Sequence, residues 1–115
     1  VQAMTERTST IPGGAVMARV LASFEAVGVV PVVVLDRVAD AVPLGRALQR
    51  GGLPIAEVTF RPAAAADAIR AMAAELPDLL VGAGTVTSTD QVDAAQAAGA
   101  RFVVTPGFNR RVVER

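Results

Sequence analysis

The sequence predicts an α/β fold in which strands and helices alternate along a single domain. Segments rich in β-branched residues begin every 22 to 26 residues, and each is followed by a segment with the apolar spacing of a helix. Such alternation predicts right-handed βαβ crossovers and a parallel sheet. The composition agrees, because 52% of the residues are hydrophobic and only 3% are aromatic, so the core must consist mainly of Ala, Val, Leu and Ile. A chain of 115 residues can bury one core of this kind.

The chain opens on a polar stretch, residues 1–13, that lacks the apolar core of a signal peptide. We interpret this stretch as a flexible leader or an expression remnant and exclude it from the fold. Residues 14–27 follow, with Val16, Val20 and Phe24 on one helical face. This spacing predicts a short amphipathic helix ahead of the first strand.

Four strand–helix units are expected after the opening helix. Their strands and helices cover residues 29–35 and 40–50, 55–61 and 62–76, 79–86 and 88–98, and 101–105 and 110–115. The first strand is a continuous β-branched run, typical of a strand buried on both faces. The signals for helix starts are Pro62, the Ser88 and Gln91 pair at capping-box spacing, and Asn109, and those for helix ends are Gly51-Gly52, Pro77 and Gly99.

Two architectures use this rhythm, an open doubly wound sheet and a (β/α)8 barrel of about 250 residues. Strand 55–61 favours the barrel, because alternation sends Glu57, Thr59 and Arg61 to one side and an apolar row to the other. A carboxylate pressed against a covering helix is costly, whereas the lumen of a barrel opens toward its active site. Residues 14–115 are therefore predicted to form half of a (β/α)8 TIM barrel. The alternative for this segment alone is a half-exposed antiparallel strand.

Glu57 and Arg61 are the charged candidates for chemistry. Glu57 could act as a general acid and base, with a pKa raised by burial and lowered again by Arg61 nearby. Arg61 offers a planar fork that suits a carboxylate, so it could hold an anionic substrate. The alternatives are a structural ion pair in the lumen for Glu57 and a salt bridge at the rim for Arg61.

Two later strands end in segments that could approach a ligand closely. The first segment is Gly82-Ala83-Gly84-Thr85, whose glycines leave the backbone uncovered and whose threonine presents one hydroxyl. A similar segment, Thr105-Pro106-Gly107, follows the next strand. The first segment lacks the third glycine of the dinucleotide fingerprint. The alternatives are a plain tight turn for the first and a rigid strand-to-helix turn for the second.

Composition excludes several classes of function. The chain has no Cys and no His, which removes thiolate zinc sites, Cys or His nucleophiles and imidazole bases. Its 11 basic and 11 acidic residues are interspersed, so a nucleic-acid partner is not expected, and no apolar run reaches the roughly 20 residues of a membrane span. All 11 basic residues are Arg, so no lysine side chain in this sequence can form a Schiff base. The absence of Cys fits a reducing compartment, and we expect a cytoplasmic protein.

Six segments agree, in order and spacing, with those of one enzyme family. They are Val30-Pro31-Val32-Val33, Gly51-Gly52 followed by Glu57-Val58-Thr59-Phe60-Arg61, Ala68-Ile69-Arg70, Val81-Gly82-Ala83-Gly84-Thr85-Val86, Ala98-Gly99-Ala100 and Pro106-Gly107. From about residue 15 to residue 115 the sequence resembles the 2-keto-3-deoxy-6-phosphogluconate (KDPG) and 4-hydroxy-2-oxoglutarate aldolases.

The resemblance implies a trimeric (β/α)8 barrel in which a lysine forms a Schiff base with pyruvate, without a metal or organic cofactor. It also implies that residues 14–115 are the N-terminal half of that barrel. By motif, Glu57 is similar to the proton-transfer residue of the family and Arg61 to the ligand of the pyruvate carboxylate. Thr85 and Pro106 are similar to walls of the pyruvate pocket. The implied reaction is reversible cleavage of KDPG, or of 4-hydroxy-2-oxoglutarate, to pyruvate and an aldehyde.

In that family the Schiff-base lysine and the phosphate-binding loops come later than the position of Arg115. The 115 residues alone are therefore expected to be inactive, and the whole protein to be a homotrimeric lyase acting on a keto acid. Two alternatives stay open. One is a non-catalytic half-barrel that buries its sheet edges by self-association, and the other is an aldolase for a different phosphorylated keto sugar acid.

Overall fold

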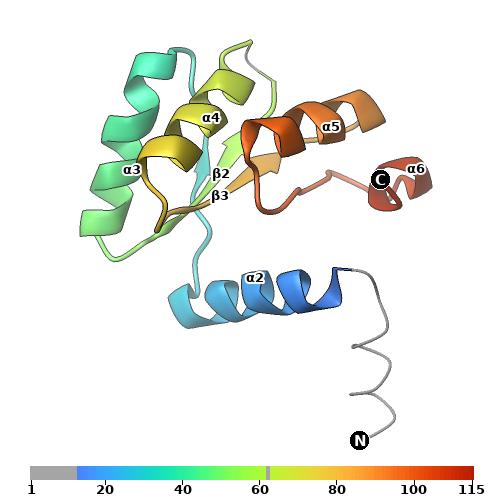
Figure 1. Ribbon diagram of the computed structural model, residues 1–115, viewed down its shortest axis with the longest axis horizontal. Helices are drawn as coiled ribbons and strands as arrows, with labels where there is room; N and C mark the ends of the chain where they lie inside the picture. The colour runs from blue at the N-terminus through green and yellow to red at the C-terminus, as the bar shows by residue number, and fades with distance from the viewer. Residues whose placement is uncertain (1–12, 62) are drawn as a thin grey trace, which may run out of the picture.

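The computed structural model describes residues 13–61 and 63–115 and shows an α/β arrangement with a parallel sheet ordered β1-β2-β3. Helices α3, α4 and α5 lie side by side over one face of the sheet (Figure 1). The elements, in order, are α2 (Gly14–Val27), β1 (Val32–Val33), η1 (Val38–Asp40), α3 (Ala41–Arg50), β2 (Ile55–Thr59), α4 (Ala65–Glu75), β3 (Leu80–Gly84), α5 (Thr89–Ala98) and α6 (Arg110–Val113). Apart from Gly13, the predicted leader lies outside the described residues.

Strand β2 is the centre of the sheet, with parallel neighbours on both sides. Its Glu57 is in register with Val32 of β1 and with Gly82 of β3. Ala56 and Val58 point the other way and are fully buried in the core beneath the helices. The predicted alternation of the two sides of this strand is therefore confirmed, although the strand ends at Thr59 rather than at residue 61.

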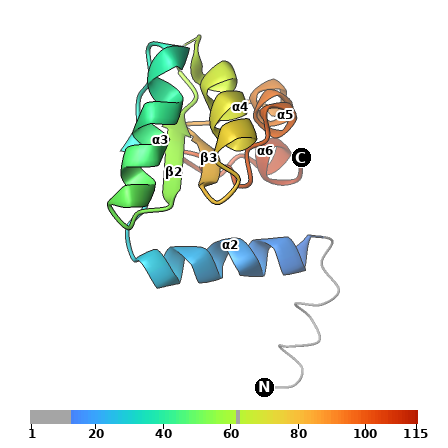
Figure 2. The same ribbon diagram turned by 60° about the vertical axis from the view of Figure 1, so that its left-hand side comes forward.

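Helix α2 lies below the rest of the molecule in both ribbon views (Figures 1 and 2), where it covers the beginnings of the strands. Its Val20 is buried together with Ile55, the first residue of β2, and with Phe102. The rings of Phe24 and Phe102 meet edge to face, with centroids 5.0 Å apart. The helix ends at Gly28, whose φ of 78° is the left-handed conformation that favours glycine. The predicted opening helix is confirmed at both ends.

The first predicted strand is shorter and more exposed than its sequence suggested. Only Val32–Val33 is regular strand, and Val32 and Val34 are 63% and 57% exposed, so burial on both faces was wrong. The reason is that the helices cover only one face of the sheet, on which Val33 and Leu35 pack into the core. The other face carries the exposed valines, and this open face is also the face of Glu57.

Residues 101–105 run parallel to β3 without forming a regular strand. Three backbone hydrogen bonds join the two segments, of which the shortest are Arg101 N–H to Val81 O and Val104 N–H to Ala83 O, both 2.8 Å. A fourth joins Val86, just after β3, to Val104. Only Ala83 and Val103 form a bridge. Residues 101–105 therefore have the predicted parallel direction and the predicted neighbour, but they form an irregular segment instead of a strand.

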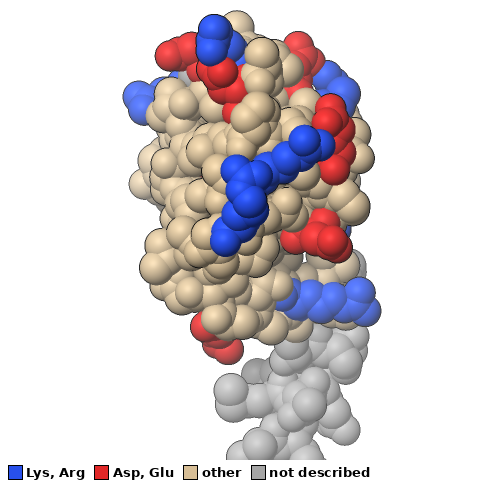
Figure 3. All heavy atoms as spheres, turned by 90° about the vertical axis from the view of Figure 1, so that its left-hand side faces the viewer, with Lys and Arg blue, Asp and Glu red and all other residues tan. Residues whose placement is uncertain are grey.

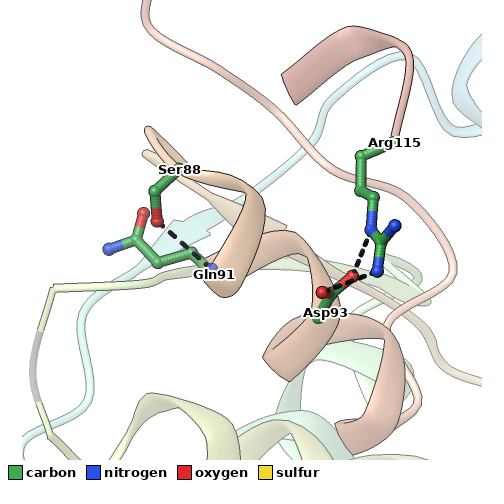
Figure 4. A network of polar contacts seen from close by, with 4 residues as sticks. All are labelled: Ser88, Gln91, Asp93 and Arg115. Carbon is green, nitrogen blue, oxygen red and sulfur yellow. Dashed lines mark hydrogen bonds and ion pairs between the residues drawn. The ribbon is translucent and has the colours of Figure 1, made fainter. Parts of the chain in front are cut away.

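Capping at α5 follows the predicted pair, as seen in Figure 4. Ser88 Oγ accepts a hydrogen bond from the backbone N–H of Gln91 at 3.2 Å, while Gln91 Oε1 accepts from the N–H of Thr87 rather than of Ser88. Arg115 donates two hydrogen bonds to the carboxylate of Asp93, at 2.7 and 2.9 Å, and lowers the pKa of that carboxyl. This pair joins the residues after α6 to α5.

The predicted start of α6 and end of α5 are confirmed, whereas α4 starts later than predicted. Asn109 caps α6 by accepting from the N–H of Arg111 at 3.1 Å, and Gly99 ends α5 with a φ of 99°. Helix α4 begins at Ala65, later than the expected start at Pro62, which itself lies outside the described residues.

The surface carries both signs of charge. On the face seen in Figure 3, acidic and basic side chains lie next to one another in several places, with uncharged surface between these groups. Among the described helices, none combines the length and the apolar character that crossing a membrane requires.

Candidate active site

Glu57 lies in the middle of β2, half-buried, on the sheet face that the helices leave open. Its backbone N–H donates to Pro31 O at 2.9 Å, which holds this part of β2 against the chain leading into β1. Its side chain extends toward the carboxyl end of the sheet and lies above Gly84 of β3, close enough that only a glycine fits beneath it. The strand and its neighbours thus fix a carboxylate over a bare stretch of backbone.

Burial raises the pKa of the Glu57 carboxyl above its ordinary value of 4.5, because desolvation disfavours the ionised form. Among residues 13–61 and 63–115, no basic side chain forms an ion pair with it. A carboxyl with a raised pKa and an open face above it is suited to both accepting and donating a proton.

The predicted lowering of the Glu57 pKa by Arg61 was wrong. Because β2 ends at Thr59, Arg61 lies in the following loop, where its side chain is exposed and no longer follows the alternation of the strand. The structure therefore does not bring these two charges together, although both belong to the same short segment.

The two other predicted residues lie at the carboxyl ends of the next segments. Thr85 directly follows β3 and has a φ of 58°, a conformation that β-branched residues rarely adopt. Pro106 is exposed and follows Thr105, whose Oγ1 donates to Gly107 O at 2.7 Å. A strained backbone such as that of Thr85 often occurs at functional sites. Glu57, Thr85 and Pro106 thus lie along three consecutive parallel segments.

Backbone hydrogen bonds align these carboxyl ends. Phe60 N–H donates to Gly84 O at 2.8 Å, and Val86 N–H donates to Val104 O at 3.2 Å. Each bond joins residues just at or beyond the end of a strand to the neighbouring segment. The carboxyl ends of β2, β3 and residues 101–105 are consequently linked by backbone hydrogen bonds along this edge of the sheet.

Sequence reasoning left two neighbours of Glu57 without a site assignment. Thr59 points to the same side as Glu57, as the alternation of β2 predicted, but its burial, with only 2% exposed, was not predicted. Gly84 lies below the carboxylate, but its contact depends on the register between β2 and β3, for which the sequence carries no direct signal.

Comparison with protein families identifies the chain. The family model described as "KDPG and KHG aldolase" matches residues 20–115. The chain belongs to this aldolase family. A 2-dehydro-3-deoxy-phosphogluconate aldolase of Treponema pallidum is 57% identical over 97 residues, which cover 84% of this chain and 46% of the relative. The corresponding aldolase of Haemophilus influenzae is 51% identical over 86 residues, or 75% of this chain and 41% of the relative.

Solved structures of this aldolase family resemble the fold. The KDPG aldolase of Legionella pneumophila, with pyruvate captured as a covalent carbinolamine intermediate, matches with a TM-score of 0.76 and 42% identity, covering 81% of this chain and 45% of that one. The enzyme of Zymomonas mobilis ZM4 with 3-phosphoglycerate matches with a TM-score of 0.68 and 44% identity, covering 72% and 39%. The chain thus spans less than half the length of these relatives.

Proposed function

We propose that the whole protein carrying this chain is a class I aldolase that reversibly cleaves KDPG, or 4-hydroxy-2-oxoglutarate (KHG), to pyruvate and an aldehyde. Membership of the aldolase family supports the reaction class. The observation that carries the proposal is the half-buried Glu57 carboxyl on the open face of β2, whose raised pKa suits a group that must take up and release protons. The carbinolamine in the Legionella relative supports pyruvate as one product.

Cleavage between C3 and C4 of the keto acid leaves an electron pair on C3, which needs an acceptor. An imine between the substrate C2 and a lysine would supply it. The 115 residues contain no lysine, and by family resemblance we place it after Arg115. Glu57 would take the proton of the C4 hydroxyl as the bond breaks, and would later return a proton to C3 of the enamine. A neighbouring water can relay either transfer.

The remaining candidates would bind and orient the pyruvate portion. Arg61 would hold its carboxylate with two parallel hydrogen bonds. Thr85 and Pro106 would bound the pocket at the carboxyl edge of the sheet, Thr85 with a hydroxyl and Pro106 with an apolar ring. These roles need no metal or organic cofactor.

We further propose that residues 14–115 supply the first four units of a (β/α)8 barrel, after a leader at residues 1–13. The exposed valines of the open face, Val32, Val34 and Val104, support this, because a barrel would enclose apolar side chains that otherwise face water. By family resemblance the protein would be a homotrimer working in the cytoplasm on a small keto acid.

Release of pyruvate from KDPG and from KHG by the purified whole protein tests the proposed function. Cleavage of at least one of the two substrates, insensitive to metal chelators, is the expected result. If the protein cleaves neither KDPG nor KHG and associates with itself into oligomers of several sizes through its sheet edges, the non-catalytic half-barrel would be the better description.

Replacing Arg61 with alanine should raise KM for the keto acid by about 10- to 100-fold and change kcat little, because a lost charged hydrogen bond weakens substrate and transition state alike. Arg50→Ala, which removes an exposed arginine at the end of α3, is the matched control and should leave KM unchanged. Equal KM values for Arg61→Ala and wild type would rule out Arg61 as the carboxylate ligand.

A further inference from the structure

Two glycines of β3 leave space on the open face beside Glu57, and each space holds a different side chain. Gly82 and Gly84 point to the same side of the sheet as Glu57, because Gly82 is its register partner and Gly84 is the partner of Thr59. The ring of Phe102 fills the space above Gly82, and the carboxylate of Glu57 fills the space above Gly84. Neither space could hold a Cβ atom as the side chains now lie.

The contact at Gly84 is with the reactive end of Glu57. A Cβ atom at this position would lie 2.8 Å from both Cδ and Cγ of Glu57, and closer still to Oε1. Real Cβ atoms essentially never approach other heavy atoms so closely. Any side chain at position 84 would therefore force the carboxylate away from β3.

The carboxylate cannot make room by moving along β3 toward Gly82. Phe102 occupies that space, and it is held there by Val20 and Ile55 in the buried cluster at the beginnings of the strands and by the edge-to-face contact with Phe24. A carboxylate displaced from β3 would therefore move outward, off the sheet, on the side where Glu57 is partly exposed. Displacement in that direction would separate the carboxyl from the C3 and C4 atoms between which it must transfer protons.

We propose that Gly84 is a positioning residue that sets the place of the Glu57 carboxyl by providing the space in which it rests. This inference rests on the proposed aldolase function. Replacing Gly84 with alanine should destabilise the fold little. The backbone of Gly84 does not have a positive φ, and the atoms that obstruct the new Cβ belong to the end of a flexible side chain. Gly84→Ala should therefore fold like the wild type and lose activity.

The test compares wild type, Gly84→Ala, Glu57→Gln and the double variant of the whole protein. Three quantities are measured: the adduct trapped with pyruvate and borohydride, the kcat and KM for exchange of the C3 protons of pyruvate in deuterium oxide, and the melting temperature. Gly84→Ala should keep the trapped adduct, the KM and the melting temperature. Its kcat for exchange should fall about 100-fold, because a displacement on the order of 1 Å can cost that much.

The double variant separates positioning from any other effect of the added methyl group. If Gly84 acts through Glu57, Gly84→Ala should cost less than about threefold when Glu57 is already glutamine, since both changes remove the same proton transfer. Gly51→Ala serves as the control for adding a methyl group, because the position is exposed and its Cβ would make only ordinary contacts, at 3.4 and 3.5 Å.

Four results would overturn the inference. Wild-type exchange in Gly84→Ala with the adduct intact would refute it and leave the aldolase proposal standing. Unfolding of Gly84→Ala, or a full 100-fold loss in both backgrounds, would show that position 84 supports the structure rather than Glu57. If the wild type traps no pyruvate, the proposed function fails and the inference falls with it.

Discussion

Replacement of Glu57 by glutamine is expected to lower kcat for aldol cleavage by about 100- to 10,000-fold, the usual contribution of a positioned general acid and base. Glutamine keeps the shape of the side chain but cannot exchange a proton. Pyruvate should still form an imine, because that step depends on the lysine, so trapping with borohydride should persist. The measurement is steady-state cleavage of KDPG together with the yield of trapped adduct.

The matched control for this variant is Glu75→Gln, which neutralises an exposed glutamate at the end of α4 and should leave kcat unchanged. The pH profile gives a second check. Burial raises the pKa of Glu57 above 4.5, so the wild-type rate should fall, as the pH is lowered, with a midpoint above that value. Full activity in Glu57→Gln, with the same acid limb as the wild type, would rule out Glu57 as the proton-transfer group.

Truncation of Ile69 to alanine should destabilise the protein by about 2 to 5 kcal/mol, because it removes buried apolar contacts and leaves a cavity in the core. Ile69 is 0% exposed, in the central helix α4, which packs between α3 and α5 and against the sheet. Denaturant unfolding of the whole protein, compared with wild type at equal protein concentration, measures the change.

The adjacent residue provides the control for Ile69. Arg70→Ala removes an exposed side chain whose ion pair with Asp67 lies on the surface, and its effect should stay within about 1 kcal/mol. A cost below about 1 kcal/mol for Ile69→Ala would mean that α4 does not pack on the sheet as described.

Local signals predicted most of the fold because they act over a few residues. Gly99, for example, ends α5 through a left-handed conformation that few other residues adopt, so this helix end could be predicted from the sequence. Alternation along β2 likewise fixed which side chains share the face of Glu57. Both signals depend on backbone geometry, which the sequence determines directly.

The errors concern properties that depend on neighbouring segments. The burial of the first strand was overestimated because the exposure of Val32 and Val34 depends on what covers the second face of the sheet. The pairing of Glu57 with Arg61 failed because the strand ended two residues early. The space above Gly84 needed the register of β3 against β2, a relation between segments about 25 residues apart in the chain.

The most direct test of the account is mass spectrometry of the whole protein after incubation with pyruvate and borohydride, followed by mapping of the modified peptide. We expect one reduced pyruvate adduct per chain, on a lysine that follows Arg115 in the sequence. We also expect the adduct to form equally in Glu57→Gln. A protein that remains unmodified while pyruvate is in excess would contradict the proposal that this chain is part of a Schiff-base aldolase.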